Sequence, residues 1–372
     1  MQQNISSTKN LHIYRSTDQK SGGFAFHIIL LRGPCAENPG EYGAASLAAM
    51  WIGIMAEKIL GARADVSVWG SSIRISIETS LEKAQNLPEF AAAIFKYSQN
   101  EHEACRKKAE DQLAAACASD AIQFHNNVFS KRWIGCASEM FRTHARAAAL
   151  KFIRFELVRD WLARNWNCGS VTCVGVTENA EALRQMESFC AGLPTANSLP
   201  FVEHIVAPAQ EFHAPAGFVG ISAPIPARAG AKEFWMAQTL AEHIQLIIPE
   251  PVEITTYKDA AGSALLFWTH AQHSDDAAVW IAAVIDVFQK VCEWNLFEEE
   301  MIRENFRTDF ETLRIQSQSD AGQLEMIIDN IRMRRDPIDS RISFDAIEYV
   351  TDADIREFAK RLFDKNFVQV FC

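Results

Sequence analysis

Residues 37–58 of the chain read ENPGEYGAASLAAMWIGIMAEK. After the Asn-Pro-Gly turn, small and apolar residues recur at helical spacing: Ala44, Leu47, Ala48, Met50, Trp51 and Ile54. This spacing predicts a buried helix that starts near Glu41 and ends near Lys58. The run contains no histidine and no cysteine, the side chains that most often hold zinc in proteins.

The composition sets broad limits on fold and partners. The chain has 372 residues, of which 48% are hydrophobic, and this is enough for two domains with good cores. The formal net charge is -11, and the basic residues are dispersed among acids. Because phosphate neutralisation needs clustered Lys and Arg, the chain is not expected to bind nucleic acid.

Targeting signals and cysteine usage predict a cytoplasmic protein. The first 15 residues, MQQNISSTKNLHIYR, lack the apolar core of a secretory signal. No segment supplies the roughly 18 uncharged apolar residues of a membrane span, so no membrane partner is expected. The nine cysteines form no CxxC pair, and we expect reduced, mostly buried thiols.

The order of predicted elements repeats once along the chain. The segment 158–176, VRDWLARNWNCGSVTCVGV, matches 355–372, IREFAKRLFDKNFVQVFC, since each is a helix, an Asn-containing turn and a strand. The predicted strand pairs 64–78 and 252–269 match in the same way, and each precedes long helices. The repeat predicts an α+β fold of two homologous domains, each a mainly antiparallel sheet flanked by helices.

The predicted domain boundaries follow from this repeat. We place an N-terminal domain at 1–195 and a C-terminal domain at 216–372. The segment 196–215 is rich in Pro and Ala and is predicted to be the linker. In the first half, the segment 123–135, QFHNNVFSKRWIG, is predicted to be a loop between helices.

Several strings, in their order, resemble a peptidase family. They include AENPGEYG at 36–43, GARADVSVWGSSIRISI at 61–77, HNNVFSKRWIG at 125–135 and NLFEEEMIRENFRTDF at 295–310. With this layout over nearly its whole length, the chain resembles the insulinase and mitochondrial-processing-peptidase family of zinc metallopeptidases. The resemblance implies a duplicated fold, with an inverted zinc motif H-x-x-E-H on the first helix and a further zinc-binding Glu on a later helix.

This chain departs from that motif at every ligand position. Counted without gaps from Pro39-Gly40, the motif positions fall on Gly43, Ser46 and Leu47; alignment on Met50 places them on Ala45, Ala48 and Ala49. The later Glu position falls near Gln112. We therefore expect no zinc, no other cofactor and no catalytic residue.

The second half also lacks residues that the resemblance implies. In active relatives, the second domain contributes an Arg and a Tyr that position the substrate. The segment 240–257, LAEHIQLIIPEPVEITTY, is shorter than the family's segment and contains no Arg, and Tyr257 aligns beyond the usual Tyr.

A peptide-binding edge could persist without zinc. The resemblance aligns Asp65, Val66, Ser67 and Val68 with the edge strand to which an extended peptide adds in active relatives. Because that mode depends on backbone hydrogen bonds, it tolerates side-chain change. The alternative is an ordinary edge strand that neighbouring segments protect.

The resulting functional hypothesis is an inactive subunit. It would form a heterodimer with an active, zinc-binding homologous subunit, complete the peptidase chamber and help bind a peptide substrate, and it would not be an enzyme on its own. One alternative is a structural or assembly protein of a larger complex. Another is an enzyme with a relocated metal held by His270 and His273, although Ser274 or Asp275 in that string also suits a helix N-cap.

Overall fold

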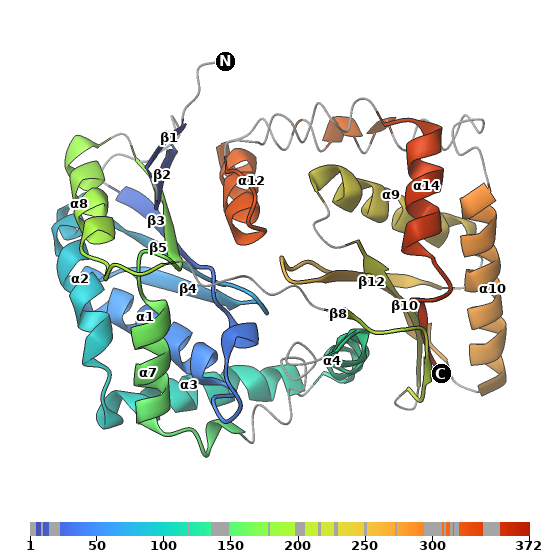
Figure 1. Ribbon diagram of the computed structural model, residues 1–372, viewed down its shortest axis with the longest axis horizontal. Coiled ribbons are helices and arrows are strands. Elements are labelled where there is room, and N and C mark those ends of the chain that lie inside the picture. The colour runs from blue at the N-terminus through green and yellow to red at the C-terminus, as the bar shows by residue number, and fades with distance from the viewer. Residues whose placement is uncertain are drawn as a thin grey trace. The chain divides into compact units, whose positions relative to one another are not determined.

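A computed structural model of the chain describes residues 5–8, 10–14, 23–117, 119–134, 149–177, 179–197, 205–214, 217–226, 230–248, 251–271, 274–293, 307–308, 310–312, 315, 320–337 and 350–372. The chain forms two compact units (Figure 1). Unit 1 consists of Met1–Ala118, Thr143–Phe201 and Asp320–Ile338. Unit 2 consists of Ser119–Arg142, Val202–Ser319 and Asp339–Cys372.

Unit 1 is built on a six-stranded sheet with the order β1-β2-β7-β3-β5-β4. The strands are β1 (Ile5–Thr8), β2 (Leu11–Tyr14), β3 (Gly23–Leu30), β4 (Arg63–Val68), β5 (Ile73–Ser80) and β7 (Val171–Val176). All neighbours pair antiparallel except β2 and β7, which are parallel. Strand β4 is therefore the edge strand on one side of this sheet.

Unit 2 is built on a five-stranded sheet with the order β11-β12-β10-β13-β9. Its strands are β9 (Glu211–Phe212), β10 (Phe218–Ile225), β11 (Glu253–Tyr257), β12 (Ser263–His270) and β13 (Gln369–Phe371). Here β13 and β9 are parallel, and the other pairs are antiparallel. A small separate pair joins β6 (Trp133–Ile134) to β8 (Ile205–Val206).

The helices follow the same repeated order. Those of the first half are η1 (Pro34–Ala36), α1 (Ala44–Leu60), η2 (Leu81–Asn86), α2 (Leu87–Ala93), η3 (Ile94–Lys96), α3 (Gln99–Cys117), α4 (Asp120–Arg132), α7 (Phe155–Asn165) and α8 (Ala180–Ala191). Those of the second half are α9 (Ala231–Ile247), α10 (Ser274–Glu293), α12 (Asp320–Arg332) and α14 (Asp352–Leu362). No helix within the described ranges has both the length and the apolar character that a membrane crossing needs.

The two sheets have the same strand order once equivalent strands are matched. Strands β4, β5, β3, β7 and β2 of unit 1 correspond in order to β11, β12, β10, β13 and β9 of unit 2. Helix α1 follows β3 as α9 follows β10, and each helix leads to the edge strand of its sheet. The predicted α+β class and the duplication are confirmed.

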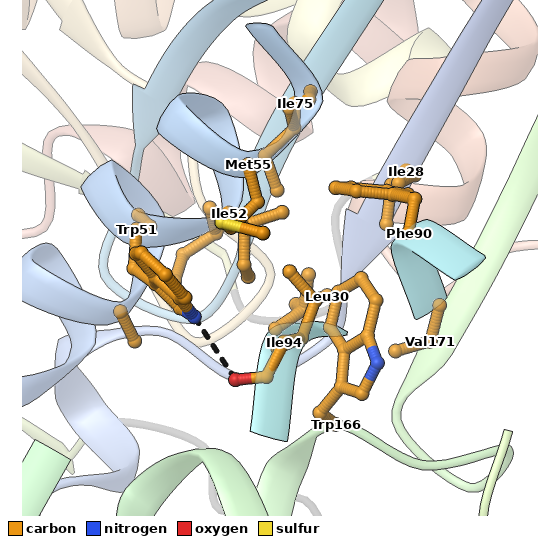
Figure 2. Packing of buried hydrophobic residues seen from close by; sticks show 14 of the residues in the cluster. Ile28, Leu30, Trp51, Ile52, Met55, Ile75, Phe90, Ile94, Trp166 and Val171 are labelled. Atoms are coloured by element: carbon orange, nitrogen blue, oxygen red, sulfur yellow. Dashed lines mark hydrogen bonds between the residues drawn. The ribbon is translucent and has the colours of Figure 1, made fainter. Parts of the chain in front are cut away.

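Helix α1 lies at the centre of the unit 1 core. Most of its side chains are buried, including Leu47, Ala48 and Ile52 at 0% exposure. The Trp51 indole nitrogen donates a hydrogen bond to the Ile94 carbonyl at 2.9 Å (Figure 2). The Trp51 and Tyr97 rings also pack edge to face. The helix is buried on nearly every side, as its continuous run of small and apolar residues requires.

One helix from each half of the sequence belongs to the unit formed mainly by the other half. Helix α12, from the second half, packs Ile327, Ile328 and Ile331 against Ile29 and Val174 on the unit 1 sheet. In Figure 1 it is the orange-red helix beside the blue strands of the first half. Helix α4, from the first half, packs its apolar side chains on the unit 2 sheet. Each unit therefore includes one helix from the other half of the sequence, so the predicted single boundary at 196–215 does not separate the two units.

The segment predicted as a loop is helical. Ser119 caps helix α4 by accepting a hydrogen bond from the Ile122 amide, and Phe124, Val128 and Phe129 are buried against the sheet. The Asn pair and the β-branched Val lower helix propensity, but burial of this apolar face outweighs it. Part of the predicted linker is also ordered, since β8 and β9 lie within it.

Candidate functional site

The N-terminus of α1 is held by a buried carboxylate. Glu37 Oε1 accepts hydrogen bonds from the amides of Gly43 (3.0 Å) and Ala45 (2.8 Å). An anion at this position satisfies free amide donors and interacts favourably with the helix dipole. Nearby, Arg164 forms an ion pair with Glu41 at 2.7 Å. Glu37 therefore stabilises the start of the helix, which begins at Ala44, directly after the left-handed Gly43.

The structure distinguishes between the two alignments of the zinc motif. Gly43 lies outside the helix, as its N-cap residue, with a φ of 103°. A Cβ atom there would lie 2.8 Å from Leu150 Cδ2 and 3.0 Å from Ile153 Cδ1, so no histidine would fit without a shift. Because H-x-x-E-H needs one helical face, this geometry favours the alignment on Met50.

In that alignment, the three motif positions are all helical and apolar. Ala45, Ala48 and Ala49 are each 0% exposed, and they belong to the unit 1 core. In the gapless alignment, Leu47 is also 0% exposed and Ser46 is partly buried. The predicted later position, Gln112, is exposed on α3. In both alignments, core packing takes the place of the metal ligands.

A buried polar chain lies between α3 and its neighbours. His102 Nε2 is 2.9 Å from the Ile153 carbonyl, which can only accept, so Nε2 carries the proton. His102 Nδ1 therefore accepts from the Tyr97 hydroxyl at 2.8 Å. Burial raises the pKa of Cys105, which is hydrogen-bonded to Tyr97, to about 12. Cys105 is therefore a protonated thiol at neutral pH, and only the thiolate is a strong nucleophile.

The alternative metal site is only partly described. His270 donates from Nδ1 to the Gly217 carbonyl at 3.2 Å, and its ring packs on Phe218. His273 lies outside the described residues. Helix α10 begins at Ser274, within one residue of the predicted start. Among the residues that the structure describes, no three His, Cys, Asp or Glu side chains come close enough to hold a metal.

The predicted peptide-binding residues lie on the edge strand of the unit 1 sheet. Asp65, Val66, Ser67 and Val68 belong to β4 and pair with Ser76, Ile75, Arg74 and Ile73 of β5. Asp65 is exposed, and the other three are partly buried. Helix α1 packs closely behind this strand, since a Cβ atom at Gly53 would lie 2.8 Å from Val66 Cγ2. Peptide binding at this edge stays a prediction.

We expect the purified protein to bind no zinc tightly at α1. After equilibration with excess zinc and removal of the free ion, metal analysis should find far less than one zinc per chain, because alanine and leucine offer no ligand atoms. An H-x-x-E-H peptidase measured in parallel serves as the positive control. Stoichiometric zinc that survives the removal step would contradict this prediction.

Comparisons with known proteins give matches only at the level of structure. No family model and no curated protein sequence matches the chain. A peptidase M16 inactive domain from Pseudomonas fluorescens is similar, with a TM-score of 0.76 and 11% identity, over 99% of this chain and 97% of that one. A complex III chain from Candida albicans has a TM-score of 0.74 and 10% identity, over 98% and 94%.

A third similar structure is a longer chain. It is a mutant of the ferredoxin protease FusC in complex with Arabidopsis ferredoxin. The TM-score is 0.74 at 11% identity, and the match covers 99% of this chain but 47% of that one. At such identities the likeness concerns the fold alone. This chain has the duplicated two-unit fold of the M16 peptidases.

Proposed function

We propose that this chain is the catalytically inactive subunit of a heterodimeric zinc metallopeptidase. It would complete the chamber around the active site of a homologous, zinc-binding partner and help to bind that partner's peptide substrate. The observation that carries the proposal is the retention of the whole fold while both alignments of the zinc motif fall on residues without ligand atoms. Fully buried Leu47 or Ala48 at these positions serves packing alone.

The size of one similar chain supports pairing. The match covers 47% of the ferredoxin protease chain, so that chain is long enough for two copies of this arrangement. If one polypeptide can contain two copies of this fold, two separate chains with the same fold can form an equivalent pair. An inactive domain also occurs among the similar structures.

The edge strand β4 is the surface by which the subunit would contact peptide. An edge strand offers backbone donors and acceptors to an extended segment. Asp65 is exposed at this edge, so a peptide could reach the strand without moving a core side chain. The contact would add binding energy without taking part in bond cleavage.

The proposal predicts a defined effect of one substitution on peptide cleavage. Mixed with its active partner, the wild-type chain should support cleavage, whereas Asp65→Pro should raise the KM for peptide about two- to tenfold. Proline removes a backbone donor and adds bulk at the edge. Asp65→Ala, which keeps the backbone amide, is the matched control and should leave KM unchanged. Thermal unfolding of both variants checks that the fold is intact.

Two outcomes would count against this function. If the partner cleaves peptide equally well without this chain, the chain does not complete an active site. If Asp65→Ala and Asp65→Pro raise KM equally, the contact depends on the side chain and not on strand pairing.

A structural role in a larger assembly is the second candidate. The similarity to a chain of complex III favours it, since that protein is part of a multi-subunit complex. Purification from native cells separates the two functions. A complex without any H-x-x-E-H subunit and without peptidase activity would favour the structural role.

A further inference from the structure

Two cysteines of unit 1 are neighbours in space, one on β7 and the other on α8. Cys173 lies within β7 and is 0% exposed, whereas Cys190 lies in the last turn of α8 and is partly buried. Their thiols are hydrogen-bonded to each other. Neither is part of a disulfide. The fold therefore holds two reduced sulfur atoms next to each other.

The close packing of α8 on β7 fixes the positions of both cysteines. A Cβ atom at Gly175 would collide with the Met186 sulfur, so the missing side chain at Gly175 lets the helix approach the strand. Cys173 is two residues before Gly175 on the same strand face, and Cys190 is one helical turn after Met186. The cysteine pair therefore lies beside the Gly175 and Met186 pair, along the same line of contact between helix and strand.

A shared hydrogen-bond acceptor places the same two residues together. The Asn10 carbonyl, just before β2, accepts from the Cys173 amide at 2.8 Å and from the Cys190 thiol at 3.8 Å. Cys168, before the start of β7, is bonded elsewhere, since its thiol donates to the Ala196 carbonyl at 3.7 Å. Cys173 and Cys190 are therefore the pair that the fold positions for a covalent bond.

We propose that Cys173 and Cys190 form a disulfide when the protein meets hydrogen peroxide, and that this bond fixes α8 to β7. A disulfide requires Cβ atoms about 3.5–4.5 Å apart, and two thiols that bond to each other can reach this geometry by rotation about their Cα–Cβ bonds and a small approach. The inference concerns unit 1 alone and needs no peptidase partner, so it stands or falls separately from the proposed function.

The oxidation consists of two balanced steps. The sulfur of Cys190, the more exposed of the two, attacks one peroxide oxygen, the O–O bond breaks, and a sulfenic acid and one water molecule are formed. The sulfur of Cys173 then attacks the Cys190 sulfur, and the S–O bond breaks. The oxygen leaves as a second water molecule with the proton of Cys173. The two thiols lose two electrons and two protons, which the peroxide takes up.

The surroundings of Cys173 determine how fast the second step runs. Burial raises the pKa of the Cys173 thiol, and the hydrogen bond with Cys190 raises it further. Because the thiolate is the attacking species, the step is slow at neutral pH and becomes faster as the pH rises. The test is therefore made at about pH 8.5 and over several hours.

Peptide mapping without reduction tests the pair directly. After the folded chain is treated with hydrogen peroxide and the remaining thiols are blocked, trypsin leaves Cys168 and Cys173 on the peptide 165–184 and Cys190 on the next one. We expect these two peptides to be linked in most chains and to separate on reduction. Cys168→Ser should form the link as the wild type does, whereas Cys173→Ala and Cys190→Ala should not.

The disulfide is also expected to stabilise unit 1. It closes a short loop and so restricts the unfolded chain, and oxidation should raise the midpoint of thermal unfolding by about 5 °C or more. Dithiothreitol should reverse this rise. Cys190→Ala treated with the same peroxide is the matched control. It shows the effect of other oxidised residues, such as methionines, and its midpoint should not rise.

Four outcomes would overturn the proposal. A missing link in chains whose Cys372 is already oxidised would show that the pair does not react. A link through Cys168 in the wild type would identify a different pair. A link that forms only in urea would mean that the folded chain does not bring the two sulfurs together. An unchanged or lower midpoint in linked chains would show that the bond does not fix α8 to β7.

Discussion

Replacement of Trp51 by alanine is expected to lower the free energy of unfolding by about 3–5 kcal/mol. The Trp51 side chain is 2% exposed and lies where α1 meets the segment around Ile94 (Figure 2). The change opens a large cavity, removes the indole donor to the Ile94 carbonyl and removes the ring contact with Tyr97. Denaturant unfolding followed by circular dichroism measures the loss.

A second variant separates the energetic cost of the cavity from that of the lost hydrogen bond, and a third serves as the control. Trp51→Phe keeps much of the buried volume and should cost less than the alanine change, since its main loss is the single donor. Phe152→Ala removes a side chain that is 83% exposed and should change stability by less than about 0.5 kcal/mol. A loss below about 1 kcal/mol for Trp51→Ala would mean that α1 is not central to the core of unit 1.

Acid is expected to destabilise unit 1 through His27. Burial lowers the pKa of His27 to about 4, with a further lowering from Arg74 that Glu325 partly offsets. The unfolded chain binds this proton near pH 6.5, so stability is full above that pH and is lost as the pH falls from 6.5 towards 4. The expected loss between pH 7.5 and pH 5 is about 2 kcal/mol.

The contacts of His27 indicate where the effect acts. His27 Nδ1 lies 3.1 Å from the Ser76 hydroxyl, which also accepts from Arg74 Nε. Arg74 forms two hydrogen bonds with Glu325 of α12, at 2.8 and 2.7 Å. Protonated His27 would repel Arg74, the residue that bonds to Glu325 of α12. Acid should therefore weaken the attachment of α12 before the rest of unit 1 unfolds.

The measurement is a comparison with a variant that does not titrate. His27→Gln can still bond to Ser76, and the difference in unfolding free energy between wild type and variant should shrink as the pH falls from 7.5 to 5. Other groups, including His12, whose burial also lowers its pKa, titrate in both proteins and cancel. A difference that stays constant with pH would contradict the role of His27.

The sequence predicted those parts of the fold whose residues carry the signal locally. The predicted strand pairs at 64–78 and 252–269 form as β4 with β5 and β11 with β12, because each pair is adjacent in the sequence and joined by a short turn. The start of α1 was placed three residues early, since the left-handed Gly43 and the Glu37 cap are tertiary features. Helix α4 was missed because Phe124 and Val128 gain their stability from strands nearly a hundred residues away.

The candidate site shows the same limit. The sequence alone shows that the zinc ligands are missing, because the motif positions hold residues such as Ala48 or Leu47, whose side chains have no ligand atom. The choice between the two alignments could not be deduced from the sequence, since it depends on how closely Leu150 and Ile153 pack against Gly43.

The exchange of α4 and α12 between the units affects the order in which the protein can fold during synthesis. Unit 1 has all six strands of its sheet once Val176 has been made, but Ile29 and Val174 lack their cover until α12 follows. At ribosomal rates of about 5–20 residues per second, that interval is on the order of ten seconds. Throughout it the nascent chain exposes an apolar sheet face, so the ribosome-bound intermediate depends on chaperones more than the finished protein does.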